Sequence, residues 1–177
     1  AAGLSAVTTS GELMTMFMLV SIGFSGAGKA FLFRIKTLGM QNGLCSILSD
    51  PRIIKVGAAV RDDVHGLQRH HNFIARSFID LQTIVWEYGI KDKSVKKMAA
   101  IILGVRISKT QQLSNWEAET LSEAQQKYAA TDAWVCREMY LALLHSEKNP
   151  LTTEQMLPNP PRQTETENDK DNIEKRA

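Results

Sequence analysis

Two apolar stretches near the start of the chain, Leu13 to Phe24 and Ala30 to Ile35, are rich in branched and aromatic residues. A glycine-rich turn, SGAGK, separates them, so the pattern predicts two strands joined as a hairpin. A third strand is predicted from Ile53 to Val60, after the turn at Asp50-Pro51. It leads into a helix that begins near Asp62-Asp63, where a carboxylate can cap the first turn.

Helical periodicity is clearest in the second half of the chain. Ser94 is placed to cap a helix that Gly104 ends. Its apolar residues recur at helical spacing: Val95, Met98, Ala99, Ile102 and Leu103. The last helix begins at Ser122, with Gln125 completing a capping box, and extends to about His145.

On this last helix, Asp132 follows Tyr128 by one turn and lies beside a stripe predicted to face the core. The stripe comprises Ala124, Tyr128, Thr131, Val135, Met139 and Ala142. An unpaired carboxylate beside a core is costly, so Asp132 needs a partner such as an arginine, a backbone N–H or a metal ion. From pattern alone, a carboxylate at the rim of the core, bonded to a neighbour, is the simpler interpretation.

Strands first and helices afterwards, with one strand–helix unit between them, indicate an α/β fold with a sheet flanked by helices. We expect residues 1–12 to be disordered, residues 13–146 to form one domain, and the polar, proline-rich residues 147–177 to form a disordered tail. No apolar stretch is long enough to span a bilayer, so we expect no membrane association.

The chain has 177 residues and a formal net charge of +2, but this small value hides a basic segment. Between Lys91 and Lys109, six basic residues stand against one acidic residue, Asp92. Such a segment is either a solvated helix face or a surface for a nucleic-acid backbone. The two cysteines form no disulfide framework and no zinc motif, which favours an intracellular, cytoplasmic protein.

Several segments, in order, resemble the 3′-to-5′ exonuclease domain of the ribonuclease D and Werner type. They are KVGAAVRDDVHGL, IDLQTIVWEYGI, the long block from KSVKK to YAATDAW, and CREMYLAL, within Lys29 to Leu144. The most specific part is a spaced set of residues: Lys109, Gln112, Ser114, Trp116, Leu121, Tyr128, Ala129 and Asp132. Within this set, Trp116 is interpreted as a packing anchor.

The resemblance implies a ribonuclease H-like mixed sheet and two divalent metal ions, Mg²⁺ or Mn²⁺. It makes Asp63 and Asp132 metal ligands, assigns Tyr128 to orienting the attacking water, and leaves Asp62 as a helix cap or a bystander. Lys109 would contact the nucleic-acid strand. The implied reaction is hydrolysis of the terminal phosphodiester of DNA or RNA at a single-stranded 3′ end.

One part of the family pattern is absent from the sequence. The family's first strand carries an Asp-x-Glu motif, yet the only acidic residue before Asp50 is Glu12. We expect the strand that bears this motif to precede residue 1, or to begin at IGF with its acidic part deleted. The chain is therefore predicted to be an incomplete or impaired exonuclease. The alternative is a non-catalytic nucleic-acid-binding module of the same fold.

A competing motif lies at Gly23 to Ala30, where GFSGAGKA nearly matches a phosphate-binding loop. Ala30 replaces the hydroxyl residue that would bind Mg²⁺, and the apolar segment after it favours a strand over a helix. A hairpin turn is the simpler interpretation, and an NTP-binding protein using Lys29 is the third hypothesis.

Overall fold

A mixed five-stranded sheet forms the centre of the protein. The computed structural model describes residues 2–7, 17–24 and 27–157. The strands are β1 (Ala2–Val7), β2 (Phe17–Phe24), β3 (Ala27–Arg34), β4 (Lys55–Gly57) and β5 (Phe78–Asp80). Their order in the sheet is β3-β2-β1-β4-β5, with β1–β2 and β2–β3 antiparallel and β1–β4 and β4–β5 parallel.

The predicted hairpin is confirmed. Strands β2 and β3 pair antiparallel, with Gly23 opposite Gly28 and Phe24 opposite Ala27. Because Lys29 lies within β3, the glycine-rich segment leads into a strand rather than a helix. The hypothesis of a phosphate-binding loop at Gly23 to Ala30 is therefore wrong, since that loop places the phosphate at the start of a helix.

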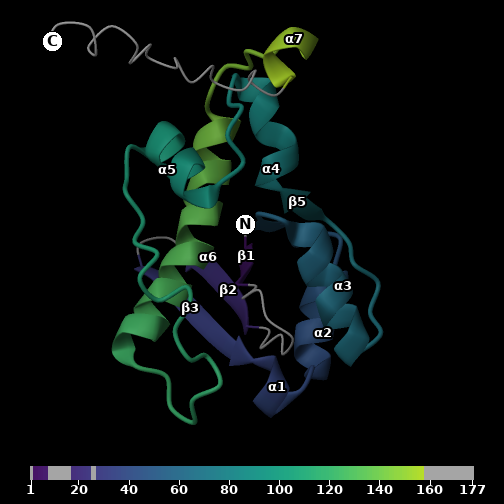
Figure 1. Ribbon diagram of the computed structural model, residues 1–177. Helices are drawn as coiled ribbons and strands as arrows, with labels where there is room; N and C mark the ends of the chain where they lie inside the picture. The colour runs from purple at the N-terminus through teal and green to yellow at the C-terminus, as the bar shows by residue number, and fades with distance from the viewer. Residues whose placement is uncertain (1, 8–16, 25–26, 158–177) are drawn as a thin grey trace, which may run out of the picture.

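The N-terminus differs from its prediction. We expected residues 1–12 to be disordered, but Ala2–Val7 forms β1, the central strand (Figure 1); residues 8–12 lie outside the described part of the chain. Small residues give a weak strand signal, yet here the backbone pairs with strands on both sides. The first-strand position of the sheet is thus occupied within this chain rather than before residue 1, by a segment that contains no Asp or Glu.

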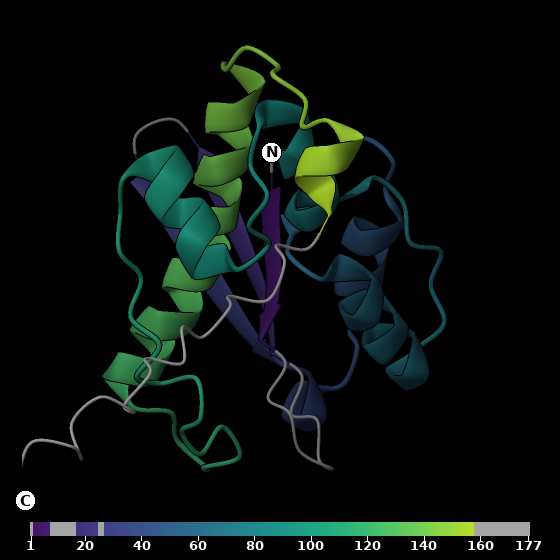
Figure 2. The same ribbon diagram turned by 45° about the horizontal axis from the view of Figure 1, so that its top comes forward.

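Helices flank the sheet in two groups, one on each side of β1. They are α1 (Ile35–Leu38), α2 (Asn42–Ser49), α3 (Val60–His70), α4 (Leu81–Ile84), the 3₁₀ helix η1 (Val85–Tyr88), α5 (Val95–Leu103), α6 (Glu123–Leu144) and α7 (Thr153–Met156). Figure 2 shows β1 in the middle, with α5 and α6 to one side and α2 and α3 to the other. No helix within the described ranges has the length and hydropathy needed to cross a membrane.

Helix boundaries largely follow the predicted caps. Gly104 ends α5 in the left-handed region at φ 68°, and α6 begins with the predicted capping box between Ser122 and Gln125. Ser94 stands at the N-cap of α5, but its side chain makes no capping hydrogen bond. The third strand is shorter than predicted, because β4 covers only Lys55–Gly57.

The buried face of α6 is wider than the predicted stripe. Val135 and Met139 are fully buried as expected, whereas Ala124 is exposed. The other buried apolar residues of this helix are Ala129, Ala133, Cys136, Tyr140 and Leu143. Helix α6 packs against both α5 and the sheet, so it buries two adjoining faces instead of one.

Residues 147–157 are not the disordered tail that their composition predicted. The Asn149 and Leu151 N–H groups donate to the carbonyls of Glu87 and Trp86 at 2.9 Å each, and Lys148 pairs with the Glu87 carboxylate at 2.5 Å. Folded partners on η1 thus supply bonds that the local sequence could not reveal. Residues 158–177 of the predicted tail lie outside the described part of the chain.

Candidate functional site

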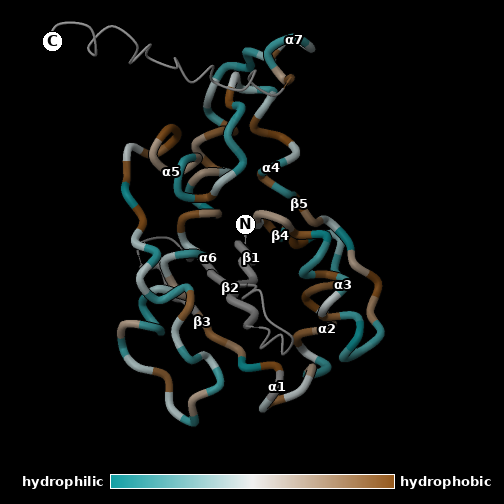
Figure 3. The backbone as a smooth tube through the Cα atoms, viewed as in Figure 1, coloured by the Kyte–Doolittle hydropathy of each residue, from teal (hydrophilic) through white to brown (hydrophobic). Residues whose placement is uncertain are grey.

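A cavity of about 300 Å³ opens between the end of β4, the start of α5 and the middle of α6. Figure 3 shows hydrophobic colour on the tube beside the β4 label, and Ala58 and Ala59, which follow this strand, line the cavity. The lining residues are Ala58, Ala59, Gln82, Lys93, Ser94, Val95, Lys96, Ile107, Ser108, Lys109, Gln112, Tyr128 and Asp132. Three of the four residues singled out in the sequence, Lys109, Tyr128 and Asp132, therefore meet here.

Tyr128 and Asp132 form the polar pair on α6. The Tyr128 hydroxyl donates a hydrogen bond to the Asp132 carboxylate one helical turn further on. Burial raises the pKa of Asp132 to about 6, although the Tyr128 hydrogen bond and the charge of Lys109 act in the opposite direction. Burial, together with the neighbouring Asp132 carboxylate, raises the pKa of Tyr128 to about 12. Near neutral pH, Tyr128 is therefore a fixed donor and Asp132 a carboxylate that is costly to ionise.

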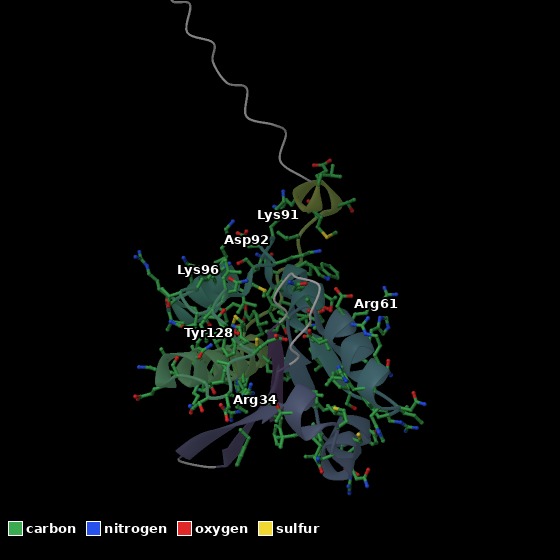
Figure 4. The ribbon with its side chains drawn as sticks, turned by 60° about the horizontal axis from the view of Figure 1, so that its bottom comes forward. Arg34, Arg61, Lys91, Asp92, Lys96 and Tyr128 are labelled. Carbon is green, nitrogen blue, oxygen red and sulfur yellow. The ribbon has the colours of Figure 1, made fainter. Side chains whose placement is uncertain are left out.

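Three lysines line the cavity that holds this pair. Lys93 lies just before α5, Lys96 lies in its first turn, and Lys109 lies in the connector after it. None of the three forms an ion pair with another described residue, whereas nearby Lys97 pairs with Asp92 at 2.7 Å. Figure 4 shows Lys96 and Tyr128 on the same side of the molecule, with Arg61 on the opposite side. The sequence marked this basic segment, but only the fold shows which lysines face the cavity.

Asp80 holds the wall beside Ala59 in place, a role the sequence did not indicate. Its carboxylate caps α4 through the Gln82 N–H at 2.9 Å and also accepts from the N–H groups of Ala59, at 3.2 Å, and Val60, at 3.0 Å. The backbone of Ala59 is in the left-handed region, with φ 58°, which is uncommon for any residue other than glycine. Three charge-assisted bonds thus stabilise a strained turn at the edge of the cavity.

The buried Trp116 also supports Tyr128, through a contact between their rings. Trp116 is 3% exposed and its ring centroid lies 6.0 Å from that of Tyr128, so the predicted role of Trp116 as a packing anchor is confirmed. The buried Gln125 amide donates to Ser114 Oγ at 3.0 Å and to the Asn115 carbonyl at 2.9 Å. Trp116, Leu121 and Ala129 of the spaced block pack with Tyr128 in one apolar cluster, so these residues have a structural role.

Asp63 does not line this cavity. It lies in the first turn of α3 and is 8% exposed, while its neighbour Asp62 is exposed at the surface. Both aspartates lie in the first turn of α3, whose N-cap residue is Ala59, so Asp62 is not the capping residue. The role of Asp63 as a metal ligand stays a prediction.

The donor set of the cavity does not fit a pair of divalent cations. Mg²⁺ and Mn²⁺ require several oxygen ligands, usually carboxylates. The cavity offers one carboxylate, Asp132, against three ammonium groups, and the described residues contain no cluster of three or more metal-ligating side chains. Strand β1, the first strand of the sheet, contributes no acidic residue. This arrangement instead suits an anionic ligand.

Comparison with known proteins supports the family resemblance that the sequence motifs indicated. A family described as 3′-5′ exonuclease matches residues 9–146. Mouse exonuclease 3′-5′ domain-containing protein 2 is 36% identical over 107 residues, covering 57% of this chain and 16% of the relative. Ribonuclease D of Gluconacetobacter diazotrophicus is 32% identical over 99 residues, covering 55% of this chain and 25% of the relative. The chain thus spans between a sixth and a quarter of these curated relatives.

The fold is also that of solved nucleases. A structure described as the apo form of a nuclease superimposes with a TM-score of 0.69 at 26% identity, covering 82% of this chain and 72% of the other. The expected ribonuclease H-like α/β fold is confirmed.

Proposed function

Because this chain belongs to the 3′-5′ exonuclease family, we propose that its cavity binds single-stranded DNA or RNA near the 3′ end, through the phosphate backbone. The observation that carries this proposal is a cavity lined by three lysines, Lys93, Lys96 and Lys109, and by one carboxylate, Asp132, whose ionisation burial disfavours. Ammonium groups that neutralise phosphates release counterions, which drives sequence-independent binding.

Each polar group of the cavity has a part in this binding. Lys109 and Lys96 both line the cavity, so a phosphate bound there is attracted by two cations. The Gln112 amide is a further donor for a phosphate or sugar oxygen. The hydroxyl of Tyr128 remains protonated at all physiological pH values, because its pKa is raised to about 12.

Hydrolysis is the reaction of the family, and we propose that this chain performs it inefficiently. The family resemblance implies two Mg²⁺ or Mn²⁺ ions on four carboxylates, whereas β1 has none and the cavity has one. A cavity lined by three lysines and one carboxylate is a poor site for a divalent cation, because the ammonium charges repel it. Binding without efficient cleavage is therefore the function that the geometry supports best.

A labelled single strand tests both halves of the proposal. The purified chain is mixed with a 5′-fluorescent eight-nucleotide strand, in EDTA or in Mn²⁺. We expect equal affinity in the two buffers, an intact strand in EDTA, little shortened product in Mn²⁺, and a loss of roughly three- to tenfold in affinity for Lys109→Ala. Lys97→Ala, which removes an ion-paired lysine on the same helix as Lys96, is the matched control and should bind as wild type.

Two results would contradict this proposal. A ladder of shortened products that disappears in Asp132→Asn would demonstrate efficient hydrolysis and a working metal site. Failure of the wild-type chain to bind the strand in either buffer would remove the nucleic-acid function altogether.

A further inference from the structure

A second cavity of about 220 Å³ adjoins the first. The two share Ile107, Ser108 and Tyr128 as a common wall. The remaining residues of the second cavity are Thr110, Gln111, Ala124, Lys127 and Thr131. A ligand that occupies both would pass beside the Tyr128 ring.

The two cavities differ in charge. Three lysines and one aspartate line the first, whereas Lys127 is the one charged residue among those that line the second. The wall of the second is mainly carbon surface, from Ile107, Ala124 and the Tyr128 ring. The second cavity thus suits an uncharged, largely apolar group.

The polar groups along this wall are mostly occupied within the protein. The Ser108 and Thr110 hydroxyls bond to each other at 3.0 Å, and the Thr131 hydroxyl donates to the Lys127 carbonyl at 2.7 Å. The Gln111 carbonyl accepts from both Ser114 Oγ and Trp116 Nε1. Few hydrogen-bonding groups remain to discriminate one ligand edge from another, so contact with an apolar face dominates here.

The Tyr128 ring is held rigidly between the cavities. Its hydroxyl bonds to Asp132 at one end, and its ring packs at a 51° angle against the buried Trp116. A rigid aromatic ring costs little conformational entropy when a ligand packs against it.

We propose that the second cavity holds a nucleobase of the strand whose phosphate lies in the first. This inference rests on the proposed function. A nucleotide joins an anionic phosphate to a flat base with apolar faces, and the two adjoining cavities have the same division of chemistry. The base contacts the protein through its face, so every base is accepted, as in other sequence-tolerant single-strand sites.

Strands with and without bases provide the test. The probes are a 5′-fluorescent eight-nucleotide strand and an abasic strand with the same number of phosphates, both measured by fluorescence anisotropy in EDTA. Wild-type protein should bind the base-bearing strand about tenfold more tightly. Ala124→Leu places a larger side chain in the second cavity and should reduce this ratio to about threefold or less, leaving affinity for the abasic strand unchanged.

Ala100→Leu makes the same substitution on the exposed face of α5, outside both cavities, and should keep the wild-type ratio. Unchanged binding of the abasic strand also shows that Ala124→Leu is folded. Equal affinity of wild type for the two strands would overturn the base site while leaving phosphate binding intact. A wild-type ratio in Ala124→Leu would overturn it as well. No binding of either strand would overturn both this inference and the proposed function.

Discussion

The Tyr128 hydroxyl donates to the Asp132 carboxylate one turn along α6, and this bond faces a cavity lined by three lysines. The relationship joins a fixed donor to a carboxylate that burial makes hard to ionise. It explains how a helix can carry an aspartate beside buried alanines: the carboxylate has both a hydrogen-bond donor and a nearby cation, Lys109.

Asp132→Asn should stabilise the protein above pH 6. The folded-state pKa of Asp132, about 6, lies above its ordinary value of 3.8, so the contribution of this carboxyl to stability is complete below pH 3.8 and is lost as pH rises through 6. An asparagine stays neutral and avoids that loss, which amounts to about 1–3 kcal/mol. Thermal melts at pH 8 should show a higher Tm for the variant, and melts at pH 3.5 should show little difference.

The exposed Asp62 on α3 provides the control for this substitution, because Asp62→Asn should leave the pH dependence of Tm unaltered. A lower Tm for Asp132→Asn at pH 8 would contradict the prediction. It would mean that the ionised carboxylate stabilises the fold.

Tyr128→Phe should raise the pKa of Asp132 above that of the wild type. The Tyr128 hydroxyl donates to the ionised carboxylate and so lowers the pKa of Asp132. Without the hydroxyl, burial raises this pKa further. A carbon-13 NMR titration of the Asp132 carboxyl measures this directly. Tyr140→Phe, which changes a buried tyrosine on the same helix but outside the cavity, should leave the titration unmoved. An unchanged or lower pKa in Tyr128→Phe would show that the hydroxyl is not bonded to the carboxylate.

Replacing the lysines of the cavity should change the salt dependence of strand binding. Removing one phosphate contact lowers the slope of log affinity against log salt by about 0.7 for single strands. Lys93→Ala and Lys96→Ala should each show this reduction in fluorescence titrations between low and moderate salt. If the ion-paired Lys97 gives the same reduction when replaced by alanine, the contribution belongs to the general charge of α5 and not to the cavity.

Asp80→Asn should destabilise the protein by about 1–3 kcal/mol. The Asp80 carboxylate accepts from three backbone N–H groups, and the amide oxygen of an asparagine is a weaker acceptor than a carboxylate. Urea denaturation measures the loss. Asp62→Asn is again the matched substitution, and it should change the free energy of unfolding by less than about 0.5 kcal/mol. Equal stability of Asp80→Asn and wild type would mean that these bonds do not hold the Ala59 turn.

Local patterns in the sequence determined several parts of this protein. The spacing of Tyr128 and Asp132 placed both on one helical face, the capping box at Ser122 set where α6 begins, and the glycine-rich segment specified the β2–β3 hairpin. These features depend on residues close together in the chain. Helical and strand periodicity and turn chemistry therefore suffice to predict them.

Only the tertiary structure decided the rest. Ala2–Val7 becomes the central strand because strands distant in sequence pair with it, and Asp80 fixes the Ala59 turn across 21 residues of chain. Likewise, packing of α5 against α6 brings Lys93 and Lys96 to the same cavity as Lys109, while Asp63 lies outside it. Each outcome depends on backbone pairing or packing between remote segments, which no local pattern of residues encodes.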